Sequence, residues 1–261
     1  MNETVLIERQ GSVAHLILNR PAKLNAFSDE MMRSLAKATG ELAADDAIRV
    51  VVLRGNGAGF CAGGDVARFH EGREQLAREF GNLGQSFHAS IHNFRDMPKP
   101  VLGCVHGAVA GGGFSLMLAT DVTIAADDSK FTLAYARIGT SPDGGSTWSL
   151  PRIVGMRKAL ELTLLPDTFD AAKALSLGLV NWVVPAAELE QRTAALAERL
   201  ANGPTAAFGR AKRLMHSTWE QPMAKQLDDE LEAFAACAAG PDFREGIASF
   251  VEKRKPRFTG K

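Results

Sequence analysis

Cysteine is scarce in this sequence, and its spacing excludes two classes of protein. Cys61, Cys104 and Cys237 are the three cysteines among 261 residues, and no two of them form a CxxC pair. The chain is therefore neither a small disulfide-stabilised domain nor a protein with a cysteine-based zinc motif. Widely separated thiols are typical of a reducing compartment, so we expect a cytoplasmic protein.

The sequence also lacks an excess of charge and a long apolar run. Its 30 basic and 30 acidic residues give a formal net charge of +0 at pH 7, so nucleic acid is not the expected partner. No apolar stretch reaches the length of a membrane span, and the N-terminal MNETVLIERQ resembles neither a secretory signal nor a transit peptide. We expect a soluble protein without a membrane partner, and we interpret the basic run at 253–257 as a solvated tail.

The order of the expected elements favours an α/β fold without a separate linker. In chain order they are a hairpin at 4–18, a helix from Ser28 to Ala43, strand 49–53, helix 76–94, strand 101–105, a helix after the glycines at 111–113, strands 121–126 and 131–134, a broken helix at 144–165, helix 170–177, strand 179–184, and helices 186–200, 206–218, 222–239 and 243–250. The first part repeats strand, strand, helix without a fixed period. The last third is helical with one apolar stripe, which suggests packing between subunits as readily as within one.

Two glycine-rich turns lie at strand-to-helix junctions, one at Gly63-Gly64 and one at Gly111-Gly112-Gly113. Because glycine has no Cβ, the amides of such turns can approach a ligand closely. The positive end of the helix after each turn favours negative charge. A single turn of this kind is a tight connection, a phosphate cradle or an oxyanion hole. Two of them can hold one oxygen between two donors, as the enolate of a thioester requires.

Glutamate is absent between Glu79 and Glu161, so aspartates are the carboxylates available to a site built around these turns. Asp143 lies in the segment SPDGGS, between a short strand and a helix, and is the candidate base. The alternative for Asp143 is a helix N-cap. The other aspartates of this region have structural explanations at element ends or in an exposed turn: Asp96, Asp121, Asp127 and Asp128.

The remaining motifs do not favour metal, hydrolase or nucleotide chemistry. No two histidines flank a glutamate in HExxH form, and His88 with His92 has no obvious third ligand, so we expect no metal site. Ser115 lies in GGGFSL, which is not the GxSxG of a hydrolase, and we interpret it as a helix residue lining the site. Neither glycine turn ends in the Lys-Ser/Thr of a P-loop.

Over essentially its whole length the chain resembles the enoyl-CoA hydratase/isomerase, or crotonase, superfamily. The matching segments are NRPAKLNA at 19–26, FCAGGD at 60–65, HGAVAGGG at 106–113 and FVEKRK at 250–255. The resemblance implies an acyl-CoA enzyme in which the amides of Gly64 and Gly112 hold the thioester oxygen. It implies a substrate and CoA site formed by Lys23, Leu24, Ala26, Ala62, Gly63, Asp65, Val66, Ser115, Phe250 and Lys253.

The same resemblance implies the organisation of the chain and its partners. A crotonase-like spiral of strand-strand-helix units would occupy residues 1–195, and residues 196–261 would form a helical trimerisation region. The expected assembly is a homotrimer or a dimer of trimers, with Phe250 and Lys253 binding CoA, often across a subunit boundary. The expected partner is an acyl-CoA thioester, and no cofactor is expected because coenzyme A is part of the substrate.

Two departures from the family pattern bear on the reaction. Hydratases of the family have glutamates where this chain has Ser115 and Tyr135, and addition of water is suited to two carboxylates. Asp143 instead matches an aspartate that phenylacetate-pathway-type isomerases use to shuttle a proton, and that 4-chlorobenzoyl-CoA dehalogenases use as nucleophile. His88 and Tyr135 fall where the dehalogenase has its water-activating histidine and an aromatic partner of the aspartate.

We therefore expect an enoyl-CoA isomerase whose catalytic residues are Asp143, Gly64, Gly112, Tyr135 and His88. In this hypothesis Asp143 removes an α or γ proton and returns it at the other carbon of a dienolate. One alternative is hydration, and another is dehalogenase-like chemistry with Asp143 as nucleophile and His88 as base. A third is a scaffold or RNA-binding protein of the same fold, in which the glycine turns are only architecture.

Overall fold

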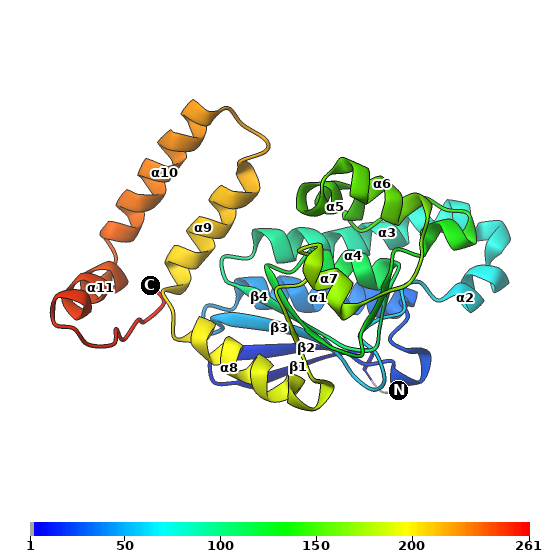
Figure 1. Cartoon of the computed structure of the whole chain (residues 1–261), viewed down its shortest axis with the longest axis horizontal. Helices are drawn as coiled ribbons and strands as arrows, with labels where there is room; N and C mark the ends of the chain where they lie inside the picture. Colours follow the sequence, from blue (N-terminus) through cyan, green and yellow to red (C-terminus); the bar gives the residue numbers. More distant parts are fainter. Residues whose placement is uncertain (1–2) are drawn as a thin grey trace.

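The computed structural model describes residues 3–261, apart from the side chains of residues 73, 75–77, 79, 80, 82 and 83. Its main sheet has six strands in the order β1-β2-β3-β4-β6-β9 (Figure 1). These strands are β1 (Val5–Gln10), β2 (Val13–Leu18), β3 (Val50–Gly55), β4 (Val101–Val105), β6 (Val122–Ala126) and β9 (Trp182–Val184). β1 and β2 form the expected antiparallel hairpin, and the other neighbouring strands of this sheet are parallel.

β3 is buried on both faces, which explains its continuous apolar sequence. Successive side chains of a strand point to opposite faces, so Val51 belongs to one hydrophobic core and Val52 to another. The first core lies between the sheet and the helices α1 (Asp29–Ala44) and α3 (Arg73–Asp96). The helix α8 (Leu189–Ala201) covers the other face (Figure 1). The sheet is therefore the middle layer of the molecule.

The helix expected from Ser28 is confirmed as α1. The Ser28 hydroxyl accepts a hydrogen bond from the Met31 amide at 3.2 Å, as an N-cap does. Met31, Leu35 and Leu42 recur at helical spacing and are fully buried. This apolar face fixes α1 against the sheet and α3.

A smaller, three-stranded sheet lies beside the main one, in the order β5-β7-β8. Its strands are β5 (Ala108–Ala110), β7 (Lys130–Thr132) and β8 (Phe169–Asp170). The other helices of the core are α2 (Val66–Glu71), α4 (Gly112–Leu118), α5 (Ser146–Val154), α6 (Met156–Leu164) and α7 (Ala171–Ser176), with 3₁₀ turns η1 (Pro21–Lys23), η2 (Tyr135–Ile138) and η3 (Ala186–Glu188). The broken helix expected at 144–165 is the pair α5 and α6, which Gly155 interrupts at a φ of 78°.

Three C-terminal helices project from the core as an arm (Figure 1). The arm consists of α9 (Thr205–Ser217), α10 (Met223–Ala238) and α11 (Pro241–Val251). The domain boundary expected after residue 195 falls inside α8, whose Ala197 and Ala201 are buried against the sheet. The helical arm therefore begins later than expected, at α9. Among residues 3–261, no helix combines the length and apolar composition needed to cross a membrane.

Candidate active site

The first glycine turn follows β3 and is hydrogen-bonded to the segment after η1. The Phe27 amide donates to the Gly63 carbonyl at 2.7 Å, and the Asp65 amide donates to the Phe27 carbonyl at 3.2 Å. In such a parallel bridge the N–H of the intervening residue, Gly64, points away from Phe27. Gly64 also lines the cavity described below, so its amide is available to a ligand there.

The second glycine turn connects β5 to α4. Gly111 adopts a φ of 49°, a left-handed value that favours glycine. Gly112 is the first residue of α4, so its amide has no acceptor within the helix. Gly112 lines the same cavity as Gly64, so one glycine of each turn borders that space.

The two turns are in direct contact. The Cys61 amide donates to the Ala108 carbonyl at 2.9 Å, and the Ala110 amide donates to the Cys61 carbonyl at 2.9 Å. A Cβ on Gly63 would lie 2.8 Å from the Ala110 oxygen, and a Cβ on Gly113 would lie 2.3 Å from the Cys61 oxygen. Glycine at these positions allows the close approach that two donors to one oxygen require.

A cavity of about 860 Å³ opens beside the turns. Its apolar wall contains aromatic rings, and the centroids of the Phe27 and Phe87 rings are 4.9 Å apart. The residues that line the cavity include Phe27, Ala62, Val66, Phe69, Phe87, Tyr135, Ile138 and Asp143. Asp143 is the one carboxylate among the described residues that line this space. The cavity thus combines two glycine turns, an apolar wall and a single carboxylate, and His70 and Arg137 also line it.

Asp143 does not cap the helix that follows it. Gly145 occupies the cap position of α5, and no side chain caps that helix. The Tyr135 hydroxyl instead donates to Asp143 Oδ1 at 2.5 Å, and Ser115 Oγ lies 2.9 Å from the same hydroxyl. The loop is fixed by Gly144, which has a φ of 60° and whose Cβ would lie 2.3 Å from the Phe87 ring. The N-cap alternative for Asp143 is therefore wrong.

The pKa values of Tyr135 and Cys61 are both raised above their ordinary values. Burial, and after it the charge of Asp143, raises the pKa of Tyr135, so its phenol keeps its proton and acts as a donor. Burial raises the pKa of Cys61 to about 12, and its thiol donates to the Asn25 carbonyl at 3.1 Å. Since a thiolate is the reactive form of cysteine, Cys61 is a structural residue of the first turn.

Asp65 anchors the first turn to the segment before it. The Arg20 guanidinium donates to Asp65 Oδ2 at 3.1 Å, and the Arg68 amide donates to Asp65 Oδ1 at 3.4 Å as α2 begins. Burial opposes ionisation of Asp65, but the hydrogen bonds from Arg20 and Arg68 outweigh it and lower the pKa of that carboxyl. The carboxylate thus helps to hold residues 61–65 in place beside Phe27.

The structure brings most of the predicted site residues together. Ala62, Val66, Gly64, Gly112, Tyr135 and Asp143 line the cavity, while Ala26, Gly63 and Ser115 are buried. Lys23 and Leu24 are exposed beside the first turn, where the Ala62 amide donates to the Leu24 carbonyl at 2.9 Å. Phe250 and Lys253 do not line the cavity, because they lie on and after α11 at the far end of the arm (Figure 1).

His88 was expected in the site, and the structure does not place it there. Its side chain is exposed on α3, whereas the neighbouring Phe87 lines the cavity. Phe87, Ile91 and Phe94 are spaced as one face of a helix, and an adjacent residue is rotated by about 100° from that face. This spacing is the signal in the sequence that identifies Phe87 as an inward residue. Phe27 and Phe69 were also missed, because nothing local in the sequence marks them.

Comparisons with known proteins cover the whole described architecture. The family model described as enoyl-CoA hydratase/isomerase matches residues 8–261. The chain is 36% identical over 262 residues to the 1,2-epoxyphenylacetyl-CoA isomerase of Escherichia coli K12, covering 100% of both chains. It is 33% identical over 260 residues to the crotonyl-CoA hydratase of Syntrophomonas wolfei, covering 99% of each. The crystal structure of an enoyl-CoA hydratase from Polaromonas sp. JS666 matches with a TM-score of 0.93 at 33% identity, covering 97% of this chain and 99% of that one. The predicted fold is confirmed, and the names of these relatives span more than one reaction.

Proposed function

The chain belongs to the enoyl-CoA hydratase/isomerase family, and from that premise we propose that it moves a double bond within an enoyl-CoA, with Asp143 as acid and base. One observation carries this proposal. The carboxylate of Asp143 lies at the wall of the cavity that also contains Gly64 and Gly112, and it is held there by Tyr135 rather than used as a helix cap.

In this mechanism the thioester oxygen lies between the amides of Gly64 and Gly112. Asp143 takes a proton from the α or γ carbon, the C–H electron pair enters a dienolate, and the negative charge on the oxygen is stabilised by the two amides. Each such donor typically contributes about 3 kcal/mol to the transition state. Asp143 then returns the proton at the other carbon, and the double bond has moved.

Isomerisation is favoured over hydration by the side chains beside Asp143. Addition of water is suited to one group that deprotonates water and a second that protonates carbon. Ser115 and Tyr135 are hydrogen-bonded to each other here, and Asp143 is the single carboxylate among the described lining residues. A single acid that gives back the proton it has taken suffices for isomerisation. Hydration stays an alternative because a relative in the comparisons is a crotonyl-CoA hydratase.

The dehalogenase-like alternative receives less support. It requires His88 to activate water near Asp143, but the His88 side chain is exposed on α3 and does not line the cavity. Phe87 occupies the inward position of that helix turn. The apolar ring of Phe87 suits the acyl group of a substrate and offers no base.

The test compares Asp143→Asn with Asp46→Asn, an exposed aspartate outside the cavity. Purified proteins are assayed against 2-enoyl, 3-enoyl and aromatic CoA thioesters, following both double-bond migration and loss of the enoyl absorbance. We expect Asp143→Asn to lose at least about 10³-fold in kcat while it still binds the CoA thioester, because only the proton transfer is removed. Asp46→Asn should behave as the wild type. Isomerase activity retained in Asp143→Asn would refute the mechanism, and net hydration by the wild type would favour the alternative.

A non-catalytic scaffold is distinguished by binding. A CoA thioester that binds the native state raises the melting temperature in proportion to its concentration relative to Kd. An enzyme of the proposed kind should show this shift together with turnover. If no thioester of the panel shifts the melting temperature, the scaffold alternative is favoured.

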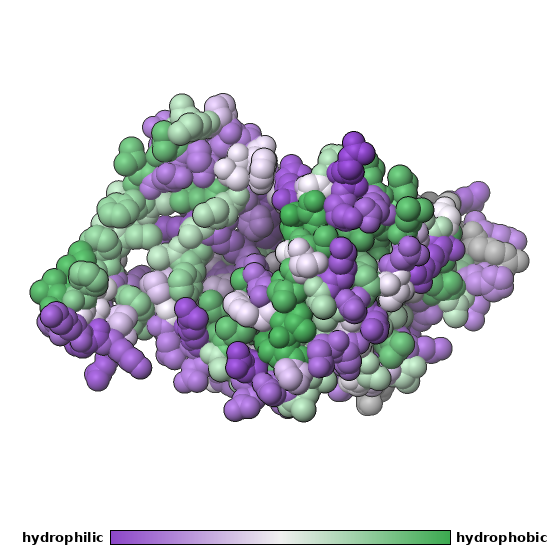
Figure 2. Space-filling model, viewed as in Figure 1, coloured by the Kyte–Doolittle hydropathy of each residue, from purple (hydrophilic) through white to green (hydrophobic). Residues whose placement is uncertain are grey.

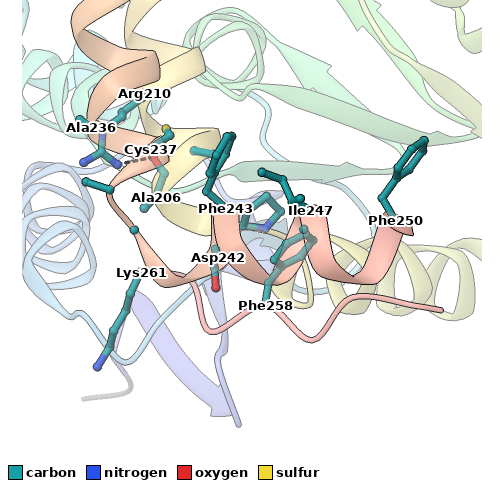
Figure 3. A pocket seen from close by; sticks show the side chains of 15 residues that line it. Ala206, Arg210, Ala236, Cys237, Asp242, Phe243, Ile247, Phe250, Phe258 and Lys261 are labelled. Atoms are coloured by element: carbon teal, nitrogen blue, oxygen red, sulfur yellow. Dashed lines mark hydrogen bonds between the residues drawn. The ribbon is translucent and has the colours of Figure 1, made fainter. Parts of the chain in front are cut away.

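We place a second copy of the chain on the apolar surface of the arm, in a trimer or a dimer of trimers. Leu231, Phe234 and Phe250 are 71%, 64% and 86% exposed, and hydrophobic residues gather along the arm (Figure 2). Figure 3 shows Phe243, Ile247 and Phe250 projecting from one side of α11 beside a cavity of about 700 Å³. Exposed apolar surfaces of this kind are typical of subunit contacts. Such an assembly would allow Phe250 and Lys253 to reach the CoA of a neighbouring subunit.

Sedimentation velocity of the wild type and Phe234→Glu tests this assembly. A wild-type trimer or hexamer that dissociates in Phe234→Glu supports it, and a wild-type monomer contradicts it.

We also propose a cytoplasmic location, because Cys61, Cys104 and Cys237 are all free thiols.

A further inference from the structure

Three side chains from three separate elements form one hydrogen-bonded series, in which Tyr135 and Asp143 line the cavity and Ser115 is buried without lining it. Ser115 comes from α4, Tyr135 from η2, and Asp143 from the loop before α5. The Tyr135 hydroxyl is 2.9 Å from Ser115 Oγ and 2.5 Å from Asp143 Oδ1. The spacing of these three residues in the sequence does not require the contacts, which form only because the three elements pack together.

Counting protons fixes the direction of the series. An ionised carboxylate can only accept, so the hydroxyl proton of Tyr135 is directed to Asp143 Oδ1. The Tyr135 oxygen then has lone pairs left, and Ser115 can donate to it. Ser115 Oγ has another acceptor in the Gly111 carbonyl at 3.4 Å, but the contact with Tyr135 is the shorter. The order of donation is therefore Ser115 to Tyr135 to Asp143.

The same series connects the acid to the oxyanion turn. Ser115 lies three residues after Gly112 on α4, so both are on the same face of that helix. Ser115 is 1% exposed, and a Cβ on Gly144 would lie 2.9 Å from the Ser115 Cβ. One short helix thus sets the position of an oxyanion donor and, through Tyr135, the position of the carboxylate.

We propose that Ser115 and Tyr135 are positioning residues that reserve Oδ1 of Asp143 and leave Oδ2 as the oxygen that exchanges the proton with substrate. This inference rests on the proposed isomerase function. In the first step the substrate C–H bond breaks, an O–H bond forms at Oδ2, and the C–H electron pair enters the dienolate. In the second step that O–H bond breaks and a C–H bond forms at the other carbon. The hydroxyl proton of Tyr135 stays on its oxygen throughout.

Tyr135→Phe is the principal test, because it keeps the ring and removes the donor. The variant is assayed with the enoyl-CoA that the panel shows to be turned over, deuterated at the carbon that loses its proton. We expect kcat to fall about 10- to 100-fold with little change in KM, since a carboxylate free to rotate loses its reactive alignment. The fraction of deuterium carried to the product should fall as well, because a mobile acid exchanges with water before it returns the label.

Ser115→Ala and Ser129→Ala form a matched pair of buried serine deletions. Ser129 is fully buried with its hydroxyl 3.4 Å from the Val105 carbonyl, and it does not line the cavity. Ser115→Ala should lower kcat about 3- to 10-fold, the effect of one neutral hydrogen bond, and should lower deuterium transfer in the same direction as Tyr135→Phe. Ser129→Ala should leave both unchanged. Melting temperatures and binding of the CoA thioester show whether each variant is folded.

The outcomes separate this inference from the proposed function. If Asp143→Asn keeps its activity, the isomerase mechanism fails and the positioning role with it. If Asp143→Asn is inactive while folded Tyr135→Phe keeps wild-type kcat and deuterium transfer, only the positioning role is overturned. If Tyr135→Phe is as inactive as Asp143→Asn, Tyr135 transfers a proton itself, which also overturns a positioning role.

Discussion

Phe131 in the core and Phe234 in the arm differ in how far their aromatic side chains are exposed to solvent. In the core, Phe131 is fully buried and stacks on Phe169 at a centroid distance of 5.7 Å. In the arm, Phe234 is 64% exposed, although it contacts Phe243 at 5.8 Å. Phe131 is therefore enclosed within one chain, while Phe234 lies on an apolar surface that one chain does not cover. Substitutions should act on folding in the first region and on association in the second.

The largest difference is expected between Phe131→Ala and Phe234→Ala. Removing the buried ring of Phe131 leaves a cavity next to Phe114 and Phe169, and should lower the free energy of unfolding by about 4 kcal/mol. Removing the exposed ring of Phe234 should lower it by about 1 kcal/mol or less. Urea unfolding of both variants, under conditions where the chain is monomeric, measures the difference. Equal losses would contradict the contrast between the two regions.

A smaller effect is expected at the joint between the regions. Lys212 on α9 lies 2.9 Å from Asp121 and donates to the Phe94 carbonyl at 2.6 Å. The Lys212 side chain is 8% exposed, so Lys212→Met leaves a carboxylate without its cation and should cost about 3 kcal/mol. The control is Lys225→Met, which removes an exposed ion pair with Asp229 within α10 and should leave the melting temperature almost unchanged. If Lys212→Met lowers the melting temperature no more than Lys225→Met does, Lys212 does not hold α9 on the core.

The smallest expected effect is on the loss of melting temperature as the pH falls. This loss has separate contributions from the core and from the arm. Hydrogen bonds from Arg20 and Arg68 lower the pKa of Asp65 despite its burial. A carboxyl with a lowered folded-state pKa contributes stability that is fully present above its unfolded pKa of about 3.9, and that is lost as pH falls through the folded value. Asp65→Asn should therefore lose less melting temperature between pH 5 and 3 than the wild type.

The arm has its own acid response, which salt can distinguish. The hydrogen bond from Arg254, with that from the Arg257 amide, lowers the pKa of Glu245 to about 2. The Glu245 side chain is 24% exposed and that of its partner Arg254 is 40% exposed. The corresponding values for Asp65 and Arg20 are 14% and 20%, so added salt should screen the Glu245 pair more strongly. The pH series is repeated at high salt for the wild type, Asp65→Asn and Glu245→Gln. High salt should abolish the difference in acid-induced loss of melting temperature between Glu245→Gln and the wild type. It should retain most of the corresponding difference for Asp65→Asn. A salt-sensitive Asp65 response would place that carboxyl among the exposed groups.

The parts of the fold and site that local chemistry determines were predictable from the sequence. The hairpin, α1 with its Ser28 cap, and the two-faced strand β3 all follow from spacing and capping. The glycine clusters located the two turns in the sequence. The structure explains why glycine is needed, because close backbone contacts exclude a Cβ at Gly63 and Gly113. Asp143 was chosen as the candidate base from the absence of glutamate between Glu79 and Glu161 and from the family resemblance, and the structure shows that it lines the cavity.

The parts that depend on tertiary contacts were not predictable in the same way. The hydrogen bond from Tyr135 to Asp143 joins two loops whose relative position is set by packing, and the resemblance identified only the residue types. His88 was predicted from alignment with another branch, although the helical spacing of its neighbours turns it outward. The boundary that the resemblance implied after residue 195 falls inside α8, and the packing of Ala197 and Ala201 on the sheet depends on tertiary contacts.

Cys61 lies where the two glycine turns meet, fully buried, with its sulfur against the Asn25 carbonyl. A maleimide cannot reach this buried sulfur, and burial, which raises the pKa of Cys61, disfavours the thiolate that alkylation requires. Each labelling event at this position would therefore record a transient separation of the turns. Labelling of Cys61 would thus report how often the two glycine turns separate, and a ligand bound between the turns should slow it.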